Sequence, residues 1–237
     1  MLDPEPATAT HDAQTPERGA ALALLPLAAT GLFYGLPDPL QQERLVQFLP
    51  QLLAYVGLAF WCTRNANRLQ KLGLPLDRLR AGLLPGTITG VVLGILNVFV
   101  ILRLAPWLGY DITFLKDTPH ANIPVLVMVP WFILLIAVAV ELNFRGFLLG
   151  RMLALCRSFP RSAASRLASP ITIVISAFVF AFDPFMVATF HHLHWIAIWD
   201  GVIWGMIWVR LGNLYATIIA HAVEVIIVYS VVRAALH

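Results

Sequence analysis

Runs of apolar residues recur along the chain at lengths that match the thickness of a lipid bilayer. A helix that crosses about 30 Å of hydrocarbon needs around 20 mostly apolar residues. Because the runs lack the two-residue alternation of a membrane barrel strand, each is expected to be a helix. The sequence therefore predicts an all-α, polytopic membrane bundle of about seven transmembrane helices. The expected spans are about 19–36, 45–62, 82–105, 123–153, 170–190, 194–210 and 214–236.

Composition excludes several other classes of protein. The 237 residues are 59% hydrophobic and 12% charged, against roughly 45–50% and about 25% in an ordinary soluble domain. The net charge of +3 is too small and too dispersed for a nucleic-acid interface, so nucleic acid is not an expected partner. Cys62 and Cys156 are the two cysteines of the chain, which supports neither a disulfide framework nor a thiolate metal site.

The ends of the expected spans suggest an orientation. Residues 1–18 are polar and rich in Pro, Ala and Thr, which predicts a disordered tail ahead of a membrane domain at 19–237. With seven crossings, eleven Lys and Arg residues fall on the side of this tail and four on the other. Because basic loops stay in the cytosol, we expect a cytosolic amino terminus in an integral protein of the cell inner membrane.

An ionisable residue inside an expected span costs a few kcal/mol and needs a partner, and the fourth and seventh spans each hold a pair of them. Glu141 and Arg145 are four residues apart, and His221 and Glu224 are three apart, so each pair shares one helix face. At about 1.5 Å per residue, Glu141 lies roughly 18 Å and His221 roughly 10 Å from the cytosolic ends of their helices. A polar cluster between these two helices is expected. The plainer alternative is that Glu141 and Arg145 neutralise each other and hold the bundle together.

A histidine-rich segment and two series of glycines are the other notable features of the sequence. His191, His192 and His194 lie in the segment FHHLH between the fifth and sixth spans. They could bind Zn or Ni, but the predicted topology puts them at the outer interface, where an interfacial role is the simpler expectation. Glycines recur every four residues at 86–94 and 201–205, which predicts close helix packing.

Three stretches resemble the CAAX protease and bacteriocin-processing family, abbreviated CPBP and also called Abi, over about residues 125–232. VELNFRGFLLGRM is similar to the family's first motif, two adjacent glutamates followed by an arginine and then Gly. ISAFVFAF resembles the helix of the second motif. GVIWGMIWVRLGNLYATIIAHAVEV resembles the Gly-rich helix, the Arg-x-Gly-Asn turn and the helix of the third motif, which begins with His. The resemblance implies a helical intramembrane protease in which Glu141, Arg145 and His221 match motif positions.

The chain departs from these motifs at three positions. The family's catalytic first glutamate falls on Val140, the second-motif histidine on Pro184, and the Asn or Asp of the third motif on Val225. A valine can neither accept a proton nor polarise water. Hydrolysis would therefore require Glu141, Glu224 or Asp183 to substitute.

Three functions are compatible with these residues. The first is a divergent peptidase that cleaves a membrane-anchored or prenylated peptide, with catalytic candidates Glu141, Arg145, His221 and Glu224, and water activated directly or through a divalent metal such as Zn. The second is an inactive relative that binds a membrane peptide as a scaffold or chaperone. The third is a small transporter or sensor that uses the buried charges as a relay. In each case membrane lipids surround the protein.

Overall fold

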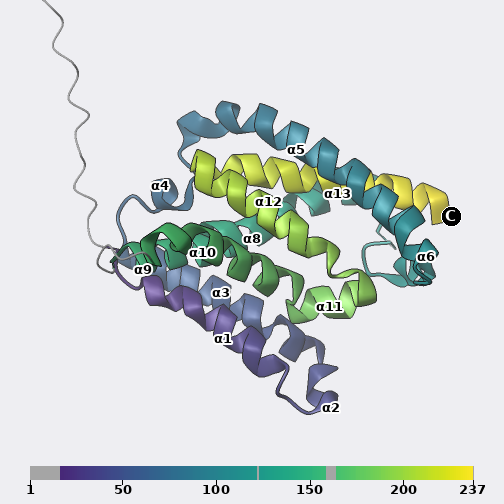
Figure 1. Ribbon diagram of the computed structural model, residues 1–237, viewed down its shortest axis with the longest axis horizontal. Helices are drawn as coiled ribbons and strands as arrows, with labels where there is room; N and C mark the ends of the chain where they lie inside the picture. The colour runs from purple at the N-terminus through teal and green to yellow at the C-terminus, as the bar shows by residue number, and fades with distance from the viewer. Residues whose placement is uncertain (1–16, 122, 159–163, 237) are drawn as a thin grey trace, which may run out of the picture.

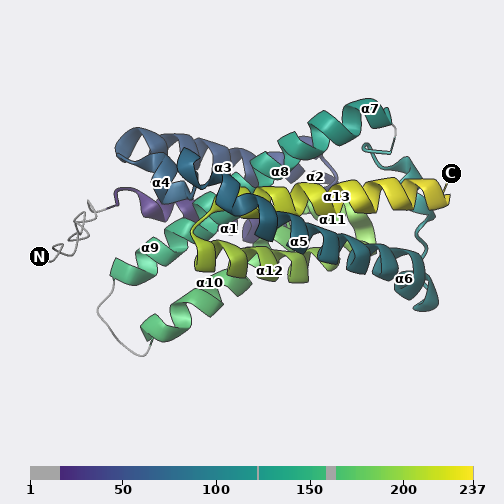
Figure 2. The same ribbon diagram turned by 90° about the horizontal axis from the view of Figure 1, so that it is seen from above.

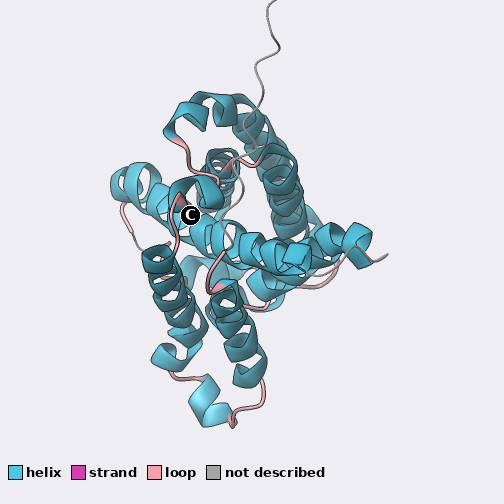
Figure 3. Ribbon diagram, turned by 90° about the vertical axis from the view of Figure 1, so that its left-hand side faces the viewer, coloured by secondary structure: helices cyan, strands magenta, loops and turns pink. Residues whose placement is uncertain are grey.

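A computed structural model describes residues 17–121, 123–158 and 164–236 (Figure 1). Every regular element in these ranges is a helix, as the colouring of Figure 3 makes plain. The expectation of an all-α chain is thereby confirmed for the described residues. The expected tail 1–18 lies outside them except for Glu17 and Arg18.

The helices include short 3₁₀ pieces (η1, η2, η4, η7) and three π-helical pieces (η3, η5, η6). Their bounds are η1 Ala20–Ala23, α1 Leu24–Phe33, α2 Asp38–Gln41, α3 Arg44–Arg64, α4 Arg68–Leu72, η2 Leu76–Arg78, α5 Leu79–Phe99, η3 Val100–Leu104, α6 Ala105–Trp107, η4 Thr113–Asp117, α7 Val125–Val127, η5 Met128–Phe132, α8 Ile133–Glu141, η6 Leu142–Leu149, α9 Gly150–Ser158, α10 Ala164–Ala181, α11 Pro184–Phe190, η7 His191–Leu193, α12 Ile196–Leu211 and α13 Leu214–Leu236.

Four helical stretches among the described residues are long and apolar enough to cross a membrane: Arg44–Arg64, Arg68–Trp107, Val125–Arg157 and Leu214–Leu236. A fifth span is present if Leu167–Ala181 and Pro184–Leu193, which are bent by 53° at their junction, are counted together. The expected number of seven is not confirmed. The first expected span forms the short apolar helix Ala20–Phe33, and the sixth forms α12 with 16 residues, which at 1.5 Å per residue falls short of about 30 Å.

The surface of the bundle is apolar and its interior holds polar groups. Large apolar side chains such as Leu84, Leu126 and Trp131 are 70% or more exposed, whereas Glu141 and Arg145 are fully buried. A soluble protein has the opposite distribution, because water would face the leucines and solvate the charges. This arrangement, together with the long apolar helices, identifies an integral membrane protein.

The helices α5 and α13 lie side by side along most of their length (Figures 1 and 2). A Cβ atom added at Gly86 would lie 2.6 Å from the carbonyl oxygen of Ala216, and one at Gly90 would lie 2.5 Å from that of Ala220. The two backbones can approach this closely because α5 has no side chains there. The expected glycine packing is confirmed. It places Asn97, two turns after Gly90 on α5, against the middle of α13.

A second glycine contact joins α10 to α12. A Cβ atom at Gly201 would lie 2.9 Å from the Cα atom of Ala177. The neighbouring residues of α12, Asp200 and Trp204, are thereby buried against the centre of the bundle. Both glycine contacts therefore position polar side chains that face one another.

The bundle is closed at one end by its loops. Leu214 N–H donates to the carbonyl of Gly73 at 2.7 Å, and the Asn213 side chain donates to the carbonyl of Arg78 at 2.8 Å. At the same end, Glu17 forms an ion pair with Arg151 and accepts a hydrogen bond from Trp61 Nε1 at 2.8 Å. These contacts fix where α13 begins, and with it the depth of His221.

Candidate active site

Glu141 stands between a partner on its own helix and one on another helix. Its Oε1 atom lies 3.1 Å from Arg145 Nη1 and 3.1 Å from His221 Nδ1. Glu141 and Arg145 have no exposed surface, and His221 is 6% exposed. Glu141 ends α8, Arg145 lies in η6 and His221 lies in α13. The structure thus brings together three of the four residues that the sequence nominates as catalytic.

Aromatic rings surround this group. The His221 ring is stacked on Trp204, with ring centroids 4.4 Å apart and planes 19° apart. The Arg145 guanidinium lies 4.7 Å from the ring centroid of Phe180 and 4.9 Å from that of Trp204. The faces of aromatic rings attract cations, so they compensate part of the cost of burying the guanidinium. They also hold the imidazole in one orientation.

Arg145 lies in a π-helical segment, Leu142–Leu149, that interrupts the span between α8 and α9. A π turn closes its hydrogen bonds over one more residue than an α turn and is frequent at functional sites. The hydroxyl of Ser176 in α10 donates to the carbonyl of Phe144 inside this segment at 2.9 Å. The irregular turn is therefore supported by a neighbouring helix, and it holds Arg145 toward the interior.

Glu224 belongs to a second polar group, built around Asn97 of α5. The Asn97 Nδ2 atom lies 3.0 Å from Asp200 Oδ2 and 2.8 Å from Glu224 Oε1, and it donates to both carboxyl groups. Trp199 Nε1 donates to Asn97 Oδ1 at 3.0 Å, which fixes the amide with its NH₂ group toward the carboxyl groups. The single amide of Asn97 thereby holds Asp200 of α12 and Glu224 of α13 beside each other. Sequence reasoning missed Asn97 and Asp200 as members of the centre, although polar residues inside apolar spans are themselves a signal.

The two groups form one polar centre. Arg145 interacts electrostatically with Glu141, Asp200 and Glu224. Several buried atoms of this centre have no hydrogen-bond partner among the described residues, and native proteins leave few such atoms unpaired. These atoms are Glu141 Oε2, Arg145 Nε and Nη2, Trp204 Nε1 and Glu224 Oε2. The centre thus offers donors and acceptors that a polar guest could use.

Asp183, the third acid considered as a substitute, has a different role. Its Oδ1 atom accepts hydrogen bonds from the backbone N–H groups of Phe185 and Met186, at 3.1 and 3.3 Å, and caps α11. Gln51 of α3 donates to the same atom at 2.8 Å. Pro184 occupies the first position of α11, where a proline fits best. The segment that resembles the second motif therefore continues into a helix cap at Asp183.

The capping role gives a first prediction. Asp183→Ala is expected to lower the free energy of unfolding by about 1 kcal/mol, because two backbone N–H groups lose their acceptor. Asp183→Asn should retain most of the stability, since Asn caps helices as well as Asp does. Thermal unfolding of the two variants in detergent micelles makes the comparison. Equal destabilisation by both substitutions would contradict the capping role.

The three histidines of FHHLH are engaged with aromatic rings. His192 is stacked on Tyr110 with centroids 4.8 Å apart, His191 lies 4.7 Å from Phe114, and His194 lies 5.0 Å from Phe182. Across the described residues, no group of three or more His, Cys, Asp and Glu side chains is arranged to hold a metal ion. The geometry of the three histidines therefore gives no support to a Zn or Ni site.

The residues beside Glu141 also do not fit a divalent metal. A catalytic zinc ion takes three protein ligands and a water, whereas Glu141 and His221 are two potential ligands. The Glu141 Oε1 atom that faces His221 is already bound to the Arg145 guanidinium. A second cation at that oxygen would be repelled by the first. Glu141 and His221 therefore do not form a divalent-metal site by themselves.

Comparison with known proteins finds one family model that matches the part of the chain containing most of this centre. Residues 122–227 match the family model described as type II CAAX prenyl endopeptidase Rce1-like. The match supports membership of this segment in the CPBP family. No curated protein and no solved structure matches the chain. The CPBP segment contains Glu141, Arg145, Asp200, His221 and Glu224, whereas Asn97 comes from α5, outside the match.

Proposed function

We propose that the chain is a divergent intramembrane peptidase that cleaves a membrane-anchored, prenylated peptide. The observation that supports this most directly is the Glu141–His221 contact, in which an acid and an imidazole from two helices meet in the interior. Membership of a CAAX endopeptidase family supports the substrate class. The distribution of basic residues supports an inner-membrane protein with a cytosolic amino terminus.

Each side chain has a role that its atoms allow. His221 Nδ1–H donates to Glu141 Oε1 and leaves Nε2 to orient a water molecule. Glu141 Oε2, which has no hydrogen-bond partner among the described residues, accepts a proton from that water. The unpaired N–H groups of Arg145 stabilise the negative charge that develops on the scissile carbonyl oxygen.

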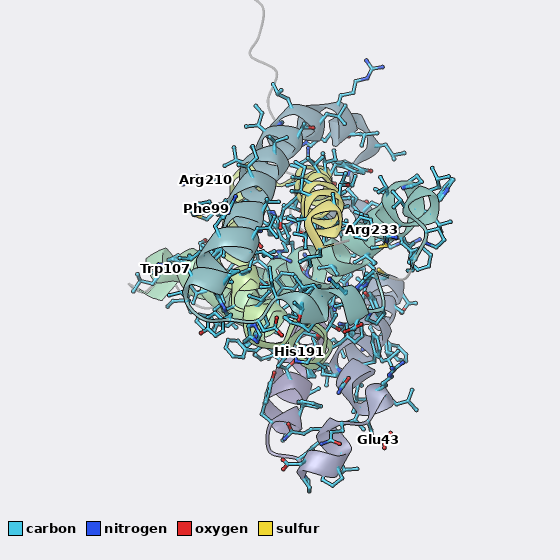
Figure 4. The ribbon with its side chains drawn as sticks, turned by 90° about the vertical axis from the view of Figure 1, so that its right-hand side faces the viewer. Glu43, Phe99, Trp107, His191, Arg210 and Arg233 are labelled. Atoms are coloured by element: carbon cyan, nitrogen blue, oxygen red, sulfur yellow. The ribbon has the colours of Figure 1, made fainter. Side chains whose placement is uncertain are left out.

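The test is cleavage of a fluorogenic prenylated peptide with a CAAX carboxyl terminus by the full chain in liposomes. Glu141→Gln and His221→Ala are each expected to lower kcat/KM at least about 100-fold, the usual range for losing an acid–base group. Glu43→Gln is the matched control, because Glu43 is exposed at the tip of the molecule far from α13 (Figure 4). Equal turnover by wild type and a Glu141→Gln/His221→Ala variant would rule out the proposal.

A second candidate is an inactive relative that binds a membrane peptide without cutting it. Val140, Pro184 and Val225 favour it, because all three replace motif residues that activate water in the family. In that case the prenylated peptide should stay intact and co-purify with the protein. Glu141→Gln should then change peptide retention while no cleavage product forms in any variant.

A further inference from the structure

Two carboxyl groups from neighbouring helices are held together in the interior. Asp200 of α12 and Glu224 of α13 are 4% and 5% exposed, and the single amide of Asn97 binds both. Like charges so close in a medium without water repel strongly, and such pairs share one proton. A proton on one of the two groups makes it a hydrogen-bond donor and removes the repulsion between two charges that one Asn97 amide holds together.

The surrounding charges also favour one shared proton on the Asp200–Glu224 pair. Glu141 of α8, Arg145 of η6 and His221 of α13 are the ionisable neighbours of the pair, and Asn97 of α5 is uncharged. Arg145 acts on all three carboxyl groups, so one guanidinium faces three acids when all are ionised. One shared proton leaves a single uncompensated negative charge instead of two. The unpartnered, buried Glu224 Oε2 and Arg145 Nη2 atoms are separate evidence that the centre accommodates a polar group.

We propose that Asp200 and Glu224 form an acid dyad that carries one proton in the membrane and donates it to the leaving nitrogen during peptide hydrolysis. This role rests on the proposed function of Glu141. Glu224 lies one turn after His221 on α13 and interacts with Glu141. The side chains of Val140, Pro184 and Val225 cannot donate a proton. The dyad supplies that proton donor instead.

Every proton in the proposed reaction has a donor and an acceptor. The oxygen of water forms a bond with the scissile carbonyl carbon while its proton passes to Glu141 Oε2. When the carbon–nitrogen bond breaks, its electron pair stays on nitrogen, which takes the proton of the dyad. The proton on Glu141 then passes to the dyad, so that amide and water yield a carboxylic acid and an amine.

Infrared spectroscopy of the full chain in lipid nanodiscs tests whether the dyad holds a proton. The wild type is expected to show the C=O stretch of a protonated carboxyl group at neutral pH. Asp200→Asn and Glu224→Gln should each remove this band, and Glu43→Gln should retain it. A wild-type spectrum without the band, or a band that survives both dyad substitutions, would overturn the dyad whether or not the peptide is cleaved.

Kinetics with the prenylated CAAX peptide test the acid role. Asp200→Asn and Glu224→Gln should lower kcat at least about 10-fold and remove the fall in rate on the alkaline side of the pH profile, because that fall reports loss of the dyad's proton. A merely structural role would lower the rate at every pH alike. Full wild-type cleavage with an unchanged profile in both variants would overturn the acid role while leaving the function of Glu141 intact.

Discussion

Arg145→Met is expected to lower the free energy of unfolding by about 3–5 kcal/mol, the usual cost of breaking a buried ion pair. The side chain has no exposed surface, and its guanidinium is paired with Glu141 and interacts electrostatically with Asp200 and Glu224. Its removal leaves these acids without a cation in an environment that cannot solvate them. Reversible unfolding in mixed micelles, followed by tryptophan fluorescence, measures the difference.

Two further variants separate the charge effect from lost packing. Glu141→Gln/Arg145→Met should recover at least half of the unfolding free energy that Arg145→Met loses, because the double variant removes the unpaired acid as well. Arg103→Met makes the same chemical change at an exposed position and should alter stability by no more than about 0.5 kcal/mol. An Arg145→Met variant as stable as wild type would show that the guanidinium does not compensate the buried acids.

The second large effect is expected at the glycine contact between α5 and α13. Gly90→Val should destabilise the protein by about 3 kcal/mol, because its Cβ atom would lie 2.5 Å from the Ala220 carbonyl oxygen and 2.7 Å from the Val223 Cβ atom. Neither backbone can yield without separating the helices. The separation would also move Asn97 away from Glu224, so the infrared band of the dyad should change in the same variant.

Gly31→Val is the matched control for this substitution. Gly31 lies on an exposed face of α1, and a Cβ atom there would meet nothing within 4 Å. The free energy of unfolding of the Gly31→Val variant should stay within about 0.5 kcal/mol of the wild-type value. Similar losses in the two variants would mean that valine is disfavoured in these helices generally, and that the close contact between α5 and α13 has no special cost.

The polar centre bears on the three positions at which the sequence departs from the motifs that it resembles. The resemblance places Val140, Pro184 and Val225 at motif positions, yet the polar centre holds Glu141, Asp200, Glu224, Arg145 and His221. Two of the polar residues, Asn97 and Asp200, come from positions that the family motifs do not mark. The motif positions alone would suggest that the site lacks catalytic groups. The side chains that contact one another in the structure show that it contains acids, an arginine and a histidine.

The sequence by itself determined that the chain is helical and membrane-embedded, because length and hydropathy suffice where lipid is the solvent. It also determined the Glu141–Arg145 pair, since residues four apart on one helix meet whatever the rest of the chain does. The predicted number of seven spans is not confirmed, because segments such as α12 are shorter than the length that a single crossing requires.

The tertiary structure alone decided which polar residues from different helices share a site. The contact of Asn97 with Asp200 and Glu224 depends on the rotation and depth of three helices, and these are set by the glycine contacts at Gly90 and Gly201. Helix periodicity fixes relations within one helix. Relations between helices follow from packing, in which every side chain along the interface takes part.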